Sequence, residues 1–512
     1  MTGKVLSLSE LSSPTAYVVL SGAVLCFGHF NTIHPGHVRY FRSARQYGTP
    51  LVVALEGDNQ LPESERARVF AESERAHAVA ALDMVDYVVI LDTGPLEALV
   101  QKMTPAALVL GKEFEYSRAS KVSSAVAEVR TQGADVHYDA GEIHYASTEL
   151  FHSSPGELEI ERWRMFQSAQ KNQKVALSEM FSTLSQSKPP RTLVVGDTIV
   201  DRYVACDPVG MSNEAPVVVV KELETQDYVG GAGIVAAHVA ALGAQCTYIS
   251  VTGVDNRAEF VASSLDDFGV DAQIVVDASR PTTFKIRYLV ENQKLFRVSY
   301  LKEHSIPAHV ETQLVQKIAD MAPNVDSILV SDFVYGVITP RIIETLLSVS
   351  REQKIPIFGD LQCSSQVGNI LKFQNFDLIC PTEREARIAL SNHDDGVEYV
   401  ANLLMGKTNS ANMILKLGAE GFIAYAGEGN GELLQRQHFP ALTVNPVDVA
   451  GAGDALLAAM SVGLTYGLSL MQASALACCA SAIAVQTVGN RPVGLDQVKR
   501  FFYQRDGLID AN

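Results

Sequence analysis

The sequence has little that would support disulfides, nucleic-acid binding or secretion. Its seven cysteines are odd in number and none are spaced as C-x-x-C, which argues against a disulfide framework and a zinc site. Lysine and arginine total 41 against 58 acidic residues, and the net charge of −17 disfavours nucleic acid and anionic membranes as partners. The start, MTGKVLSLSE, lacks a basic segment followed by an apolar one, so we expect no signal peptide and a cytoplasmic location.

Long uncharged stretches are also scarce. The exception runs from residue 455 to residue 486, where no charged side chain occurs. A membrane-spanning helix needs about 20 predominantly apolar residues, but Gly463, Gly467 and several hydroxyl residues interrupt this stretch. We therefore expect two short buried helices with a break at Gly467.

Strand-like and helix-like segments alternate along most of the chain. Its 512 residues and 47% apolar content are typical of two or three globular domains. The alternation predicts parallel sheets covered by helices, and the prolines of SQSKPPRT separate two such series. We predict a first α/β domain over residues 1–150, a helical linker over 151–190 and a second α/β domain over 191–512.

The stretch CFGHFNTIHPGHVRYF places His34 and His37 between a predicted strand and a predicted helix. In parallel sheets, ligands bind at the carboxyl ends of strands and in front of helix N-termini, where unpaired N–H groups favour anions. Two imidazoles at such a place could stabilise a phosphate that gains charge during a reaction. The residues alone leave two alternatives, a metal pair with His29 as a further ligand, or ordinary solvated histidines.

H-x-G-H after a strand resembles the nucleotidyltransferases of the cytidylyltransferase-like superfamily. The segments ERAHAVAALDMVDYVVI, PAALVLGKEFEYS and HYASTELF resemble further parts of that family in the same order. The resemblance implies a Rossmann-like domain in which His34 and His37 stabilise the α-phosphate of ATP or CTP. It also implies nucleotide and phosphate contacts from Phe27, Gly28, Asn31, Gly36, Arg75, Lys112, Ser147 and Thr148.

A second unusual stretch, DVAGAGDALLAAM, places Gly451, Ala452 and Gly453 before an apolar helix, with Asp454 in its first turn. Glycines let the backbone approach a ligand closely, and exposed N–H groups form an anion hole. A carboxylate beside such a hole suits a base that deprotonates the hydroxyl attacking a phosphate. The alternative is a helix-capping aspartate, which stabilises a helix by about 1 kcal/mol.

G-A-G-D before a helix resembles the ribokinase-like (PfkB-type) carbohydrate kinases. LVVGDTIVDRY, YVGGAGIVAAHVAALGA and CPTEREA extend the resemblance, which runs from Arg191 to about Lys499. It implies an α/β domain with a small β lid, ATP and Mg²⁺ as cofactors, Asp454 as the base, and by analogy a homodimer formed through the lid. The implied phosphate contacts are Gly418, Gly421, Gly451, Ala452 and Gly453, the sugar contacts are Asp197, Asp201, Gly230, Gly231 and Lys285, and the residue organising the metal is Glu385.

The heptose kinases are the most similar group within that family, on RPTTFKIRYLVENQKLFRVSY and MSNEAPVVVV. The bifunctional enzymes of ADP-heptose synthesis join the same two domains with the kinase first, whereas here the order is reversed. The resemblance therefore implies a bifunctional kinase and nucleotidyltransferase of nucleotide-sugar synthesis, whose substrates are sugar phosphates and nucleoside triphosphates.

Several residues depart from the family patterns and leave other interpretations open. One domain could have lost catalysis and serve as a ligand-sensing or assembly module, or the kinase could act on a nucleoside or small polyol and the transferase on a cofactor precursor. GAGIVA also fits a dinucleotide-binding fingerprint, but the preceding ELETQDY does not have a clean strand pattern, so we expect no NAD site. The departures are Asn31, Leu110, Ile234, Tyr335, Gln362, Thr382 and Ala450.

Overall fold

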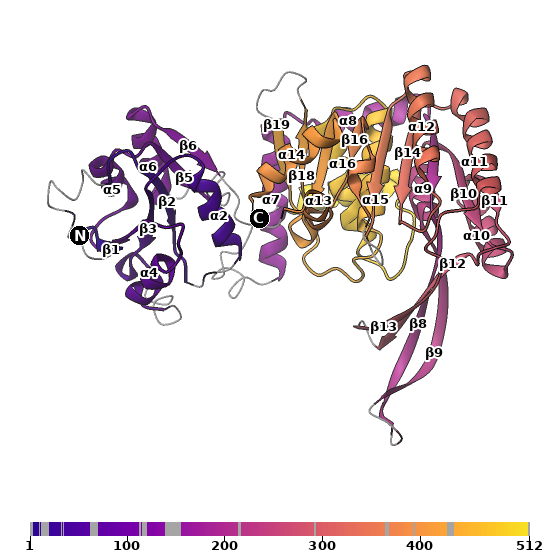
Figure 1. The fold of residues 1–512 in the computed structure, drawn as a ribbon, viewed down its shortest axis with the longest axis horizontal. Coiled ribbons are helices and arrows are strands. Elements are labelled where there is room, and N and C mark those ends of the chain that lie inside the picture. The colour runs from indigo at the N-terminus through magenta and orange to yellow at the C-terminus, as the bar shows by residue number, and fades with distance from the viewer. Residues whose placement is uncertain are drawn as a thin grey trace. The chain divides into compact units, whose positions relative to one another are not determined.

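The chain divides into two compact units, Met1–His152 with Asn392–Val400, and Ser153–Ser391 with Ala401–Asn512 (Figure 1). The domain limits expected from the sequence stay predictions. The structure is a computed structural model that describes residues 4–9, 11, 20–31, 33, 35–61, 70–111, 114, 120–138, 155–212, 214, 217–290, 293–363, 368–392, 395–427 and 435–509.

The first unit contains a six-stranded parallel sheet in the order β1-β4-β3-β2-β5-β6. Alternate residues of its strands enter two separate hydrophobic clusters, Leu25 and Phe27 in one and Val24 and Cys26 in the other. Both faces of the sheet are therefore buried, as the helical crossovers between parallel strands require. The strands are β1 (Val5–Ser7), β2 (Val24–Gly28), β3 (Leu51–Glu56), β4 (Tyr87–Leu91), β5 (Ala107–Leu110) and β6 (Asp135–Tyr138), and the helices are α2 (Pro35–Arg45), α4 (Glu72–Ala80), α5 (Leu96–Met103) and α6 (Ser120–Thr131).

The strand order reverses between β2 and β5. From β2 the chain adds β3 and β4 on one side, and then β5 and β6 on the other. Such a switch point opens a crevice at the carboxyl ends of the two strands, where open α/β sheets bind ligands. The segment carrying His37 starts at this point, directly after β2.

The second unit contains a nine-stranded sheet in the order β11-β10-β7-β14-β15-β16-β17-β18-β19. Its strands are parallel from β11 to β17 and antiparallel at β18 and β19. The order reverses between β7 and β14, so a second crevice is expected there. The strands are β7 (Arg191–Gly196), β10 (Gln245–Thr252), β11 (Asp271–Val276), β14 (Ser327–Asp332), β15 (Ile357–Leu361), β16 (Leu378–Ile379), β17 (Asn412–Lys416), β18 (Phe422–Ala426) and β19 (Gln435–Phe439).

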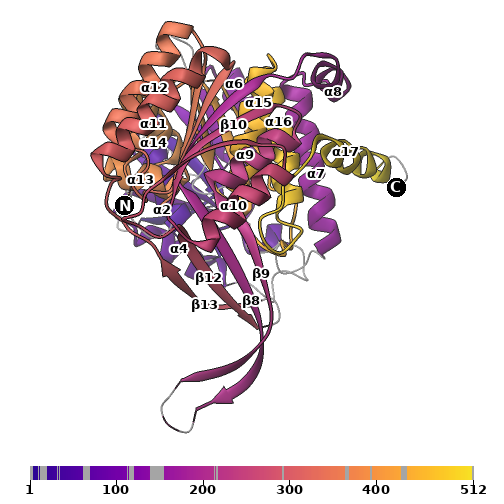
Figure 2. The ribbon, with the colours of Figure 1, turned by 90° about the vertical axis from the view of Figure 1, so that its right-hand side faces the viewer.

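Helices lie on both faces of this sheet. Helices α11 and α12 pack together on one side, and α9, α15 and α16 on the other (Figure 2). The helices from residue 155 onward are α7 (Pro155–Asn172), α8 (Leu177–Gln186), α9 (Ala232–Ala241), α10 (Asn256–Asp267), α11 (Ala308–Met321), α12 (Pro340–Gln353), α13 (Glu383–Leu390), α14 (Val397–Thr408), α15 (Ala452–Thr465), α16 (Leu470–Ala484) and α17 (Leu495–Ile509).

Helices α7 and α8 occupy the region where we expected a helical linker. Trp163 of α7 packs on Phe166 and on Phe502 of α17, with ring centroids 5.1 and 5.6 Å apart. These side chains belong to the same hydrophobic core as those of α15 and α16. In this structure α7 and α8 therefore contribute to the core of the second unit.

The uncharged stretch from residue 455 to residue 486 forms helices α15 and α16. Gly467 lies between them with a φ of 86°, a left-handed conformation that suits glycine. Both helices are mostly buried, which confirms the prediction of two short helices with a break. Among the residues described, no helix is long and apolar enough to cross a membrane.

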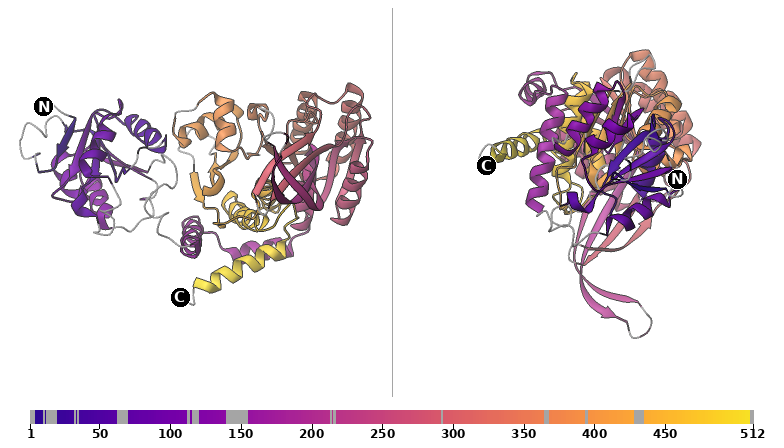
Figure 3. Two further views of the ribbon diagram at one scale, coloured as in Figure 1. Left: turned by 90° about the horizontal axis from the view of Figure 1, so that it is seen from below. Right: turned by 90° about the vertical axis from the view of Figure 1, so that its left-hand side faces the viewer.

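A four-stranded sheet in the order β13-β12-β8-β9 projects from the second unit (Figures 2 and 3). Its strands are β8 (Thr198–Met211), β9 (Val218–Gly231), β12 (Thr283–Val290) and β13 (Gln293–Tyr300). ELETQDY, which lacks a clean strand pattern in the sequence, lies in β9 and pairs antiparallel with β8. Most of β9 is exposed, so no alternation of apolar and polar residues marks it in the sequence.

Candidate active sites

The first candidate site lies at the switch point of the six-stranded sheet, where β2 ends at Gly28. A side chain at Gly28 would press on the ring of Phe30, since a Cβ there would lie 2.7 Å from Phe30 Cζ. Phe30 has a φ of 51°, and its ring packs edge-on against His37 with ring centroids 5.1 Å apart. Phe27 is buried beneath this turn. The half-buried His37 imidazole is therefore held in the first turn of α2.

Two further predicted nucleotide contacts lie close to this turn. Asn31 Oδ1 accepts a hydrogen bond from the Phe70 N–H at 2.8 Å, which joins the β2–α2 loop to the segment before α4. Gly36 belongs to the first turn of α2, whose N–H groups have no partner within the helix. The other predicted residues of this site, His34, Lys112, Ser147 and Thr148, lie outside the described residues.

Arg75 has a fully buried guanidinium group at the same edge of the sheet. Its Nη2 donates to the carbonyl of Glu56 at 3.0 Å and pairs with Asp58 Oδ1 at 2.6 Å. Its Nη1 donates to the carbonyl of His29 at 2.6 Å, and its Nε donates to the carbonyl of Phe70 at 2.9 Å. Arg75 thus ties together the ends of β2 and β3, and its predicted phosphate contact stays a prediction.

The second candidate site is built around the start of α15. Gly451 is the N-cap with a φ of 82°, and Ala452 and Gly453 open the helix, so their N–H groups have no acceptor within it. Asp454 lies in this first turn, and its Oδ1 accepts a hydrogen bond from Gln362 Nε2 at 2.6 Å. The capping interpretation of Asp454 finds no support, since the N-cap is Gly451.

The Asp454 carboxyl is buried, with 6% of the residue exposed. This burial and the nearby Asp360 carboxylate raise the pKa of Asp454 to about 7. A group that titrates near neutral pH is suited to accepting a proton from a substrate hydroxyl. The geometry and the protonation behaviour of Asp454 therefore fit the predicted base.

Lys416 supplies a buried positive charge to this site. Its Nζ contacts both carboxylate oxygens of Asp360, at 2.8 and 2.7 Å. A Cβ built on Gly453 would lie 3.5 Å from the same Nζ, so the ammonium group lies against the first turn of α15. Burial opposes the charge, but the Asp360 carboxylate outweighs it and raises the pKa of Lys416 above its ordinary value. A cation at the positive end of a helix favours binding of an anion there.

Asp201 lies in β8, at the base of the four-stranded sheet. One carboxylate oxygen pairs with Arg287 of β12, and the other accepts a hydrogen bond from Asn490 Nδ2 at 3.0 Å. A side chain at Gly230 would collide with that second oxygen, which explains the glycine there. Gly231 has a φ of 61° and a Cβ there would meet the carbonyl of Asp197, so both predicted glycines shape the wall beside Asp201.

Asp197 follows β7 at the switch point of the nine-stranded sheet. Its carboxylate accepts hydrogen bonds from the backbone N–H groups of Phe333, Tyr335 and Val337, at 2.8, 3.3 and 3.2 Å. Burial and the neighbouring Asp332 raise its pKa. Lys285 is buried next to the same segment, with its ammonium 4.9 Å from the ring centroid of Tyr335. Asp197 therefore orders residues 333–337, and direct sugar contacts from Asp197 and Lys285 stay predictions.

Glu385 lies in the first turn of α13, and both of its carboxylate oxygens accept hydrogen bonds from backbone N–H groups. The N–H groups of Cys363 and Thr382 donate to them at 2.9 and 2.8 Å, the second as part of a capping box. Gly418 and Gly421, with φ values of 64° and 92°, bracket the turn after β17. The described residues contain no group of three or more histidine, cysteine or acidic side chains arranged to hold a metal by themselves.

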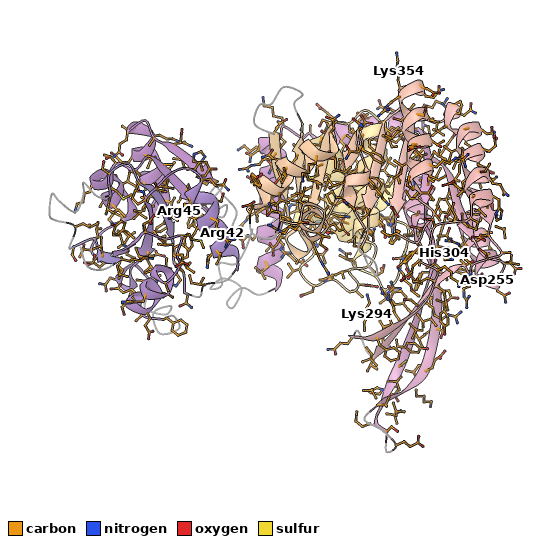
Figure 4. The ribbon with its side chains drawn as sticks, viewed as in Figure 1. Arg42, Arg45, Asp255, Lys294, His304 and Lys354 are labelled. Carbon is orange, nitrogen blue, oxygen red and sulfur yellow. The ribbon has the colours of Figure 1, made fainter. Side chains whose placement is uncertain are left out.

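Asp448 connects the four-stranded sheet to the loop before α15. Lys294 of β13, labelled in Figure 4, donates to Asp448 Oδ1 at 2.6 Å, and the Tyr203 hydroxyl of β8 donates to Oδ2 at 2.6 Å. Asp448 Oδ1 also accepts from the Ala450 N–H at 3.0 Å. These bonds outweigh the effect of burial and hold the pKa of Asp448 below its ordinary value. Strands β8 and β13 of the four-stranded sheet thereby contact the loop before α15 directly.

Comparison with known families follows the same two regions. Residues 190–496 match the pfkB family of carbohydrate kinases. The chain belongs to this family. Residues 25–155 match the cytidylyltransferase-like family, so a nucleotidyltransferase-like region precedes the kinase region, in the order that the sequence motifs predict.

Relatives and solved structures agree with this assignment. The bifunctional protein HldE of Trichlorobacter lovleyi is 31% identical over 316 residues, which are 61% of this chain and 62% of that protein. The protein of the same name from Campylobacter jejuni is 30% identical over 326 residues, 63% of this chain and 66% of the relative. The matched segments thus span less than two thirds of these relatives.

The structural neighbours show the ribokinase-like fold of the second unit. Phosphofructokinase-2 from Escherichia coli in complex with substrates and products has a TM-score of 0.51 and 17% identity, covering 62% of this chain and all of that chain. Its tetrameric inhibited form has a TM-score of 0.50 and 16% identity over the same shares. The predicted fold class, a Rossmann-like nucleotidyltransferase region followed by a ribokinase-like α/β region with a β lid, is confirmed.

Sequence reasoning missed Lys416, Arg287 and Asn490. A lysine that ends the apolar strand MILK, directly before a glycine turn, is a detectable signal for Lys416. Arg287 lies two residues after Lys285, on the same face of β12, and could have been found by that spacing. For Asn490, within TVGNRPVG, only a turn pattern is visible.

Proposed function

We propose that the chain is a bifunctional enzyme of nucleotide-sugar synthesis. The second unit transfers the γ-phosphate of ATP to the anomeric hydroxyl of a heptose or related sugar phosphate, and the first unit transfers a nucleotidyl group to a sugar 1-phosphate. The observation that carries the kinase proposal is the position of Asp454, buried in the first turn of α15 between the open amides of Gly451–Gly453 and the Lys416 charge. This position combines a base with an anion site.

In the proposed kinase reaction, the γ-phosphate of ATP lies at the N–H groups of Gly451–Gly453. Asp454 removes the proton from the attacking sugar hydroxyl, which then forms a bond to the γ-phosphorus while ADP leaves. Lys416 stabilises the negative charge on the transferred group, and Asp360 holds Lys416 in place. Asp201 accepts a hydrogen bond from another hydroxyl of the sugar.

Mg²⁺ bound with ATP would neutralise phosphate charge in this reaction. It is usually held by one or two carboxylates together with water and substrate phosphates, so a full protein cage is not required. We assign this role to Asp360, which pairs with Lys416, and to Glu385, which accepts a hydrogen bond from the N–H of Cys363, the residue after Gln362. The backbone bonds to Glu385 fix the direction of its carboxylate.

In the proposed nucleotidyl transfer, the sugar phosphate oxygen attacks the α-phosphate of ATP or CTP and pyrophosphate leaves. The crevice between β2 and β5 would hold the nucleotide. His37, at the start of α2, would donate a hydrogen bond to the α-phosphate as charge develops, and we expect His34 to act with it. The aromatic contact with Phe30 orients the His37 ring for this role.

Two variants test the proposal. We expect Asp454→Asn to abolish ATP-dependent sugar phosphorylation and to leave nucleotidyl transfer from a supplied sugar 1-phosphate intact. We expect His37→Ala to do the reverse. Product analysis by mass spectrometry with ATP and CTP separates the two activities. An equal loss of both activities in either variant would show that two independent sites do not exist.

A second candidate function is favoured by Arg75. Every guanidinium nitrogen of Arg75 already donates a hydrogen bond to protein atoms instead of to a phosphate. The first unit could therefore serve as a ligand-sensing module without catalysis. Release of pyrophosphate from each nucleoside triphosphate, measured with a panel of sugar phosphates, separates the two functions. A catalytic first unit releases pyrophosphate in step with the nucleotide sugar, whereas a sensing module releases none.

We also propose that the chain forms a dimer through its four-stranded sheet. The outer parts of β8 and β9 carry exposed apolar side chains, and exposed apolar patches of this kind mark interaction surfaces. They include Val209, Met211, Val217, Val218 and Leu223.

A further inference from the structure

Asn490 lies between the proposed sugar contact and the proposed phosphate site. Its Nδ2 donates to Asp201 Oδ2 at 3.0 Å. Because a carboxylate only accepts hydrogen bonds, this contact fixes which end of the amide faces Asp201 and which end faces away. A Cβ built on Gly451 would lie 3.0 Å from Asn490 Oδ1, so the amide oxygen lies beside the N-cap of α15.

The amide oxygen of Asn490 is buried and receives no hydrogen bond from any part of the chain that the structure describes. Only 8% of the residue is exposed. Buried polar atoms without a partner are rare in native proteins, and each one points to a missing donor. The acidic groups of the same site, Asp201 and Asp454, only accept hydrogen bonds when ionised, so a donor on a bound substrate or water completes the asparagine.

Glycines let the backbone approach this amide closely on both sides. A Cβ built on Gly230 would lie 3.1 Å from Asn490 Nδ2, and one built on Gly451 would lie 3.0 Å from its Oδ1. Any other residue at these two positions would press on the asparagine. The asparagine therefore has its amide nitrogen fixed by Asp201, while its amide oxygen lies beside the N-cap of α15 and lacks a hydrogen-bond donor.

We propose that Asn490 is a specificity-determining residue that accepts a hydrogen bond from a hydroxyl of the phosphorylated substrate. Asp201 takes a neighbouring hydroxyl, so the pocket selects a polyol with two adjacent hydroxyl groups close to the one that is phosphorylated. The amide oxygen and the carboxylate are both acceptors, and hydroxyl groups are the donors that a sugar offers to them. This assignment rests on the proposed kinase function of the second unit.

The test is a cycle that combines a protein variant with substrate analogues. We measure kcat/KM of the full chain and of Asn490→Ala for the best sugar substrate and for each of its monodeoxy analogues. In the unmodified chain, removal of the hydroxyl that faces Asn490 should lower kcat/KM by about 10- to 100-fold, because the amide oxygen is again left unpaired. In Asn490→Ala, kcat/KM for the same analogue should lie within about threefold of kcat/KM for the parent sugar. The variant and the analogue each remove one partner of the same hydrogen bond, so their effects do not add. The KM for ATP should not change.

Asn412→Ala is a matched control. Asn412 Nδ2 also donates one hydrogen bond, to the Asp377 carbonyl at 3.0 Å, but at the amino-terminal end of β17, away from the site. This variant should keep the full discrimination against the deoxy analogue. Asn490→Ser provides a smaller change in case Asn490→Ala does not fold, as judged from its thermal unfolding.

Failure of this proposal differs from failure of the proposed kinase function. If the unmodified chain phosphorylates no polyol in the panel, the kinase function falls and this assignment falls with it. If the chain phosphorylates a sugar but Asn490→Ala and Asn490→Ser discriminate among the deoxy analogues as the unmodified chain does, only the role of Asn490 is overturned. Loss of discrimination at one hydroxyl, with ATP binding unchanged, supports it.

Discussion

Replacement of Lys416 by methionine should distinguish the contribution of its charge to the stability of the second unit from its contribution to catalysis. The side chain is 11% exposed and pairs with Asp360, which is completely buried. Removal of one partner of a buried ion pair typically costs about 3–5 kcal/mol, because the remaining charge is left without compensation. Part of that cost is relieved here, since burial already raises the pKa of Asp360 to about 6 and protonation removes its charge. We therefore expect Lys416→Met to lower the stability of the second unit by about 2–4 kcal/mol at pH 7.

The double variant Lys416→Met, Asp360→Asn removes both charges and should recover most of that stability. It should not recover activity, because the cation beside the first turn of α15 is still missing. Loss of one group that stabilises transition-state charge typically lowers kcat by about 100- to 1000-fold. Urea unfolding and initial rates at saturating ATP measure the two effects on the same samples. A Lys416→Met protein with kcat within about threefold of the unmodified chain would refute the role given to this lysine.

Three further predictions concern Asp454, Arg75 and the four-stranded sheet. The kinase kcat/KM should fall as pH drops through about 7, where Asp454 becomes protonated. Asp360→Asn should move this fall to lower pH, because it removes a neighbouring negative charge that raises the pKa of Asp454. A pH–rate profile measures both effects, and a profile that is flat from pH 5 to pH 8 would contradict the role of Asp454 as base. Arg75→Met should destabilise the first unit by about 3 kcal/mol, because it leaves three carbonyls and Asp58 without their donor. Kinase activity should be retained, and equal urea midpoints for variant and parent would be inconsistent with this prediction. Light scattering should show a dimer for the parent chain and a monomer for the pair Val218→Asp, Leu223→Asp, and an unchanged mass would exclude the four-stranded sheet as the interface.

Ionisation of Asp454 also affects stability. Its pKa in the folded state, about 7, is higher than the ordinary value of 3.8. The folded state therefore binds more protons than the unfolded state between about pH 4 and pH 7, and stability decreases as pH rises through this window. Asp454→Asn should stabilise the second unit at pH 8, on the order of 1–4 kcal/mol, and should flatten the pH dependence of its urea midpoint. A variant less stable than the parent at pH 8 would contradict this reasoning.

The sequence was most informative where strands are buried on both faces. Apolar runs such as LVVAL and SILVSDF marked β3 and β14, because burial on both faces demands continuous apolar residues. Strands β8 and β9 extend into solvent, so their outer residues follow no such pattern. The alternation of strands and helices was thus predictable, and the length of the lid strands was not.

The candidate sites divide in a similar way. Gly451 and Asp454 lie close together in the sequence, so their motif by itself predicts an anion site with a base. Partners that are distant in sequence leave no local signal, as with Lys416 and Asp360, 56 residues apart, or Asn490 and Asp201, 289 residues apart. Such contacts depend on the order of strands in the sheet, which a single sequence does not specify. For this reason the sequence predicted the motif at the centre of the second candidate site but missed Lys416, Arg287 and Asn490.

Phosphorus NMR of the full chain and of Asp454→Asn, each with ATP, Mg²⁺ and a sugar substrate, tests the central claim most directly. The unmodified chain should form ADP and the newly phosphorylated sugar in equal amounts, and it should release pyrophosphate together with a nucleotide sugar when a sugar 1-phosphate is supplied. The Asp454→Asn protein should form neither ADP nor sugar phosphate, yet release pyrophosphate when a sugar 1-phosphate is supplied. Formation of ADP and sugar phosphate by Asp454→Asn at the rate of the unmodified chain would contradict a phosphoryl-transfer site at the start of α15.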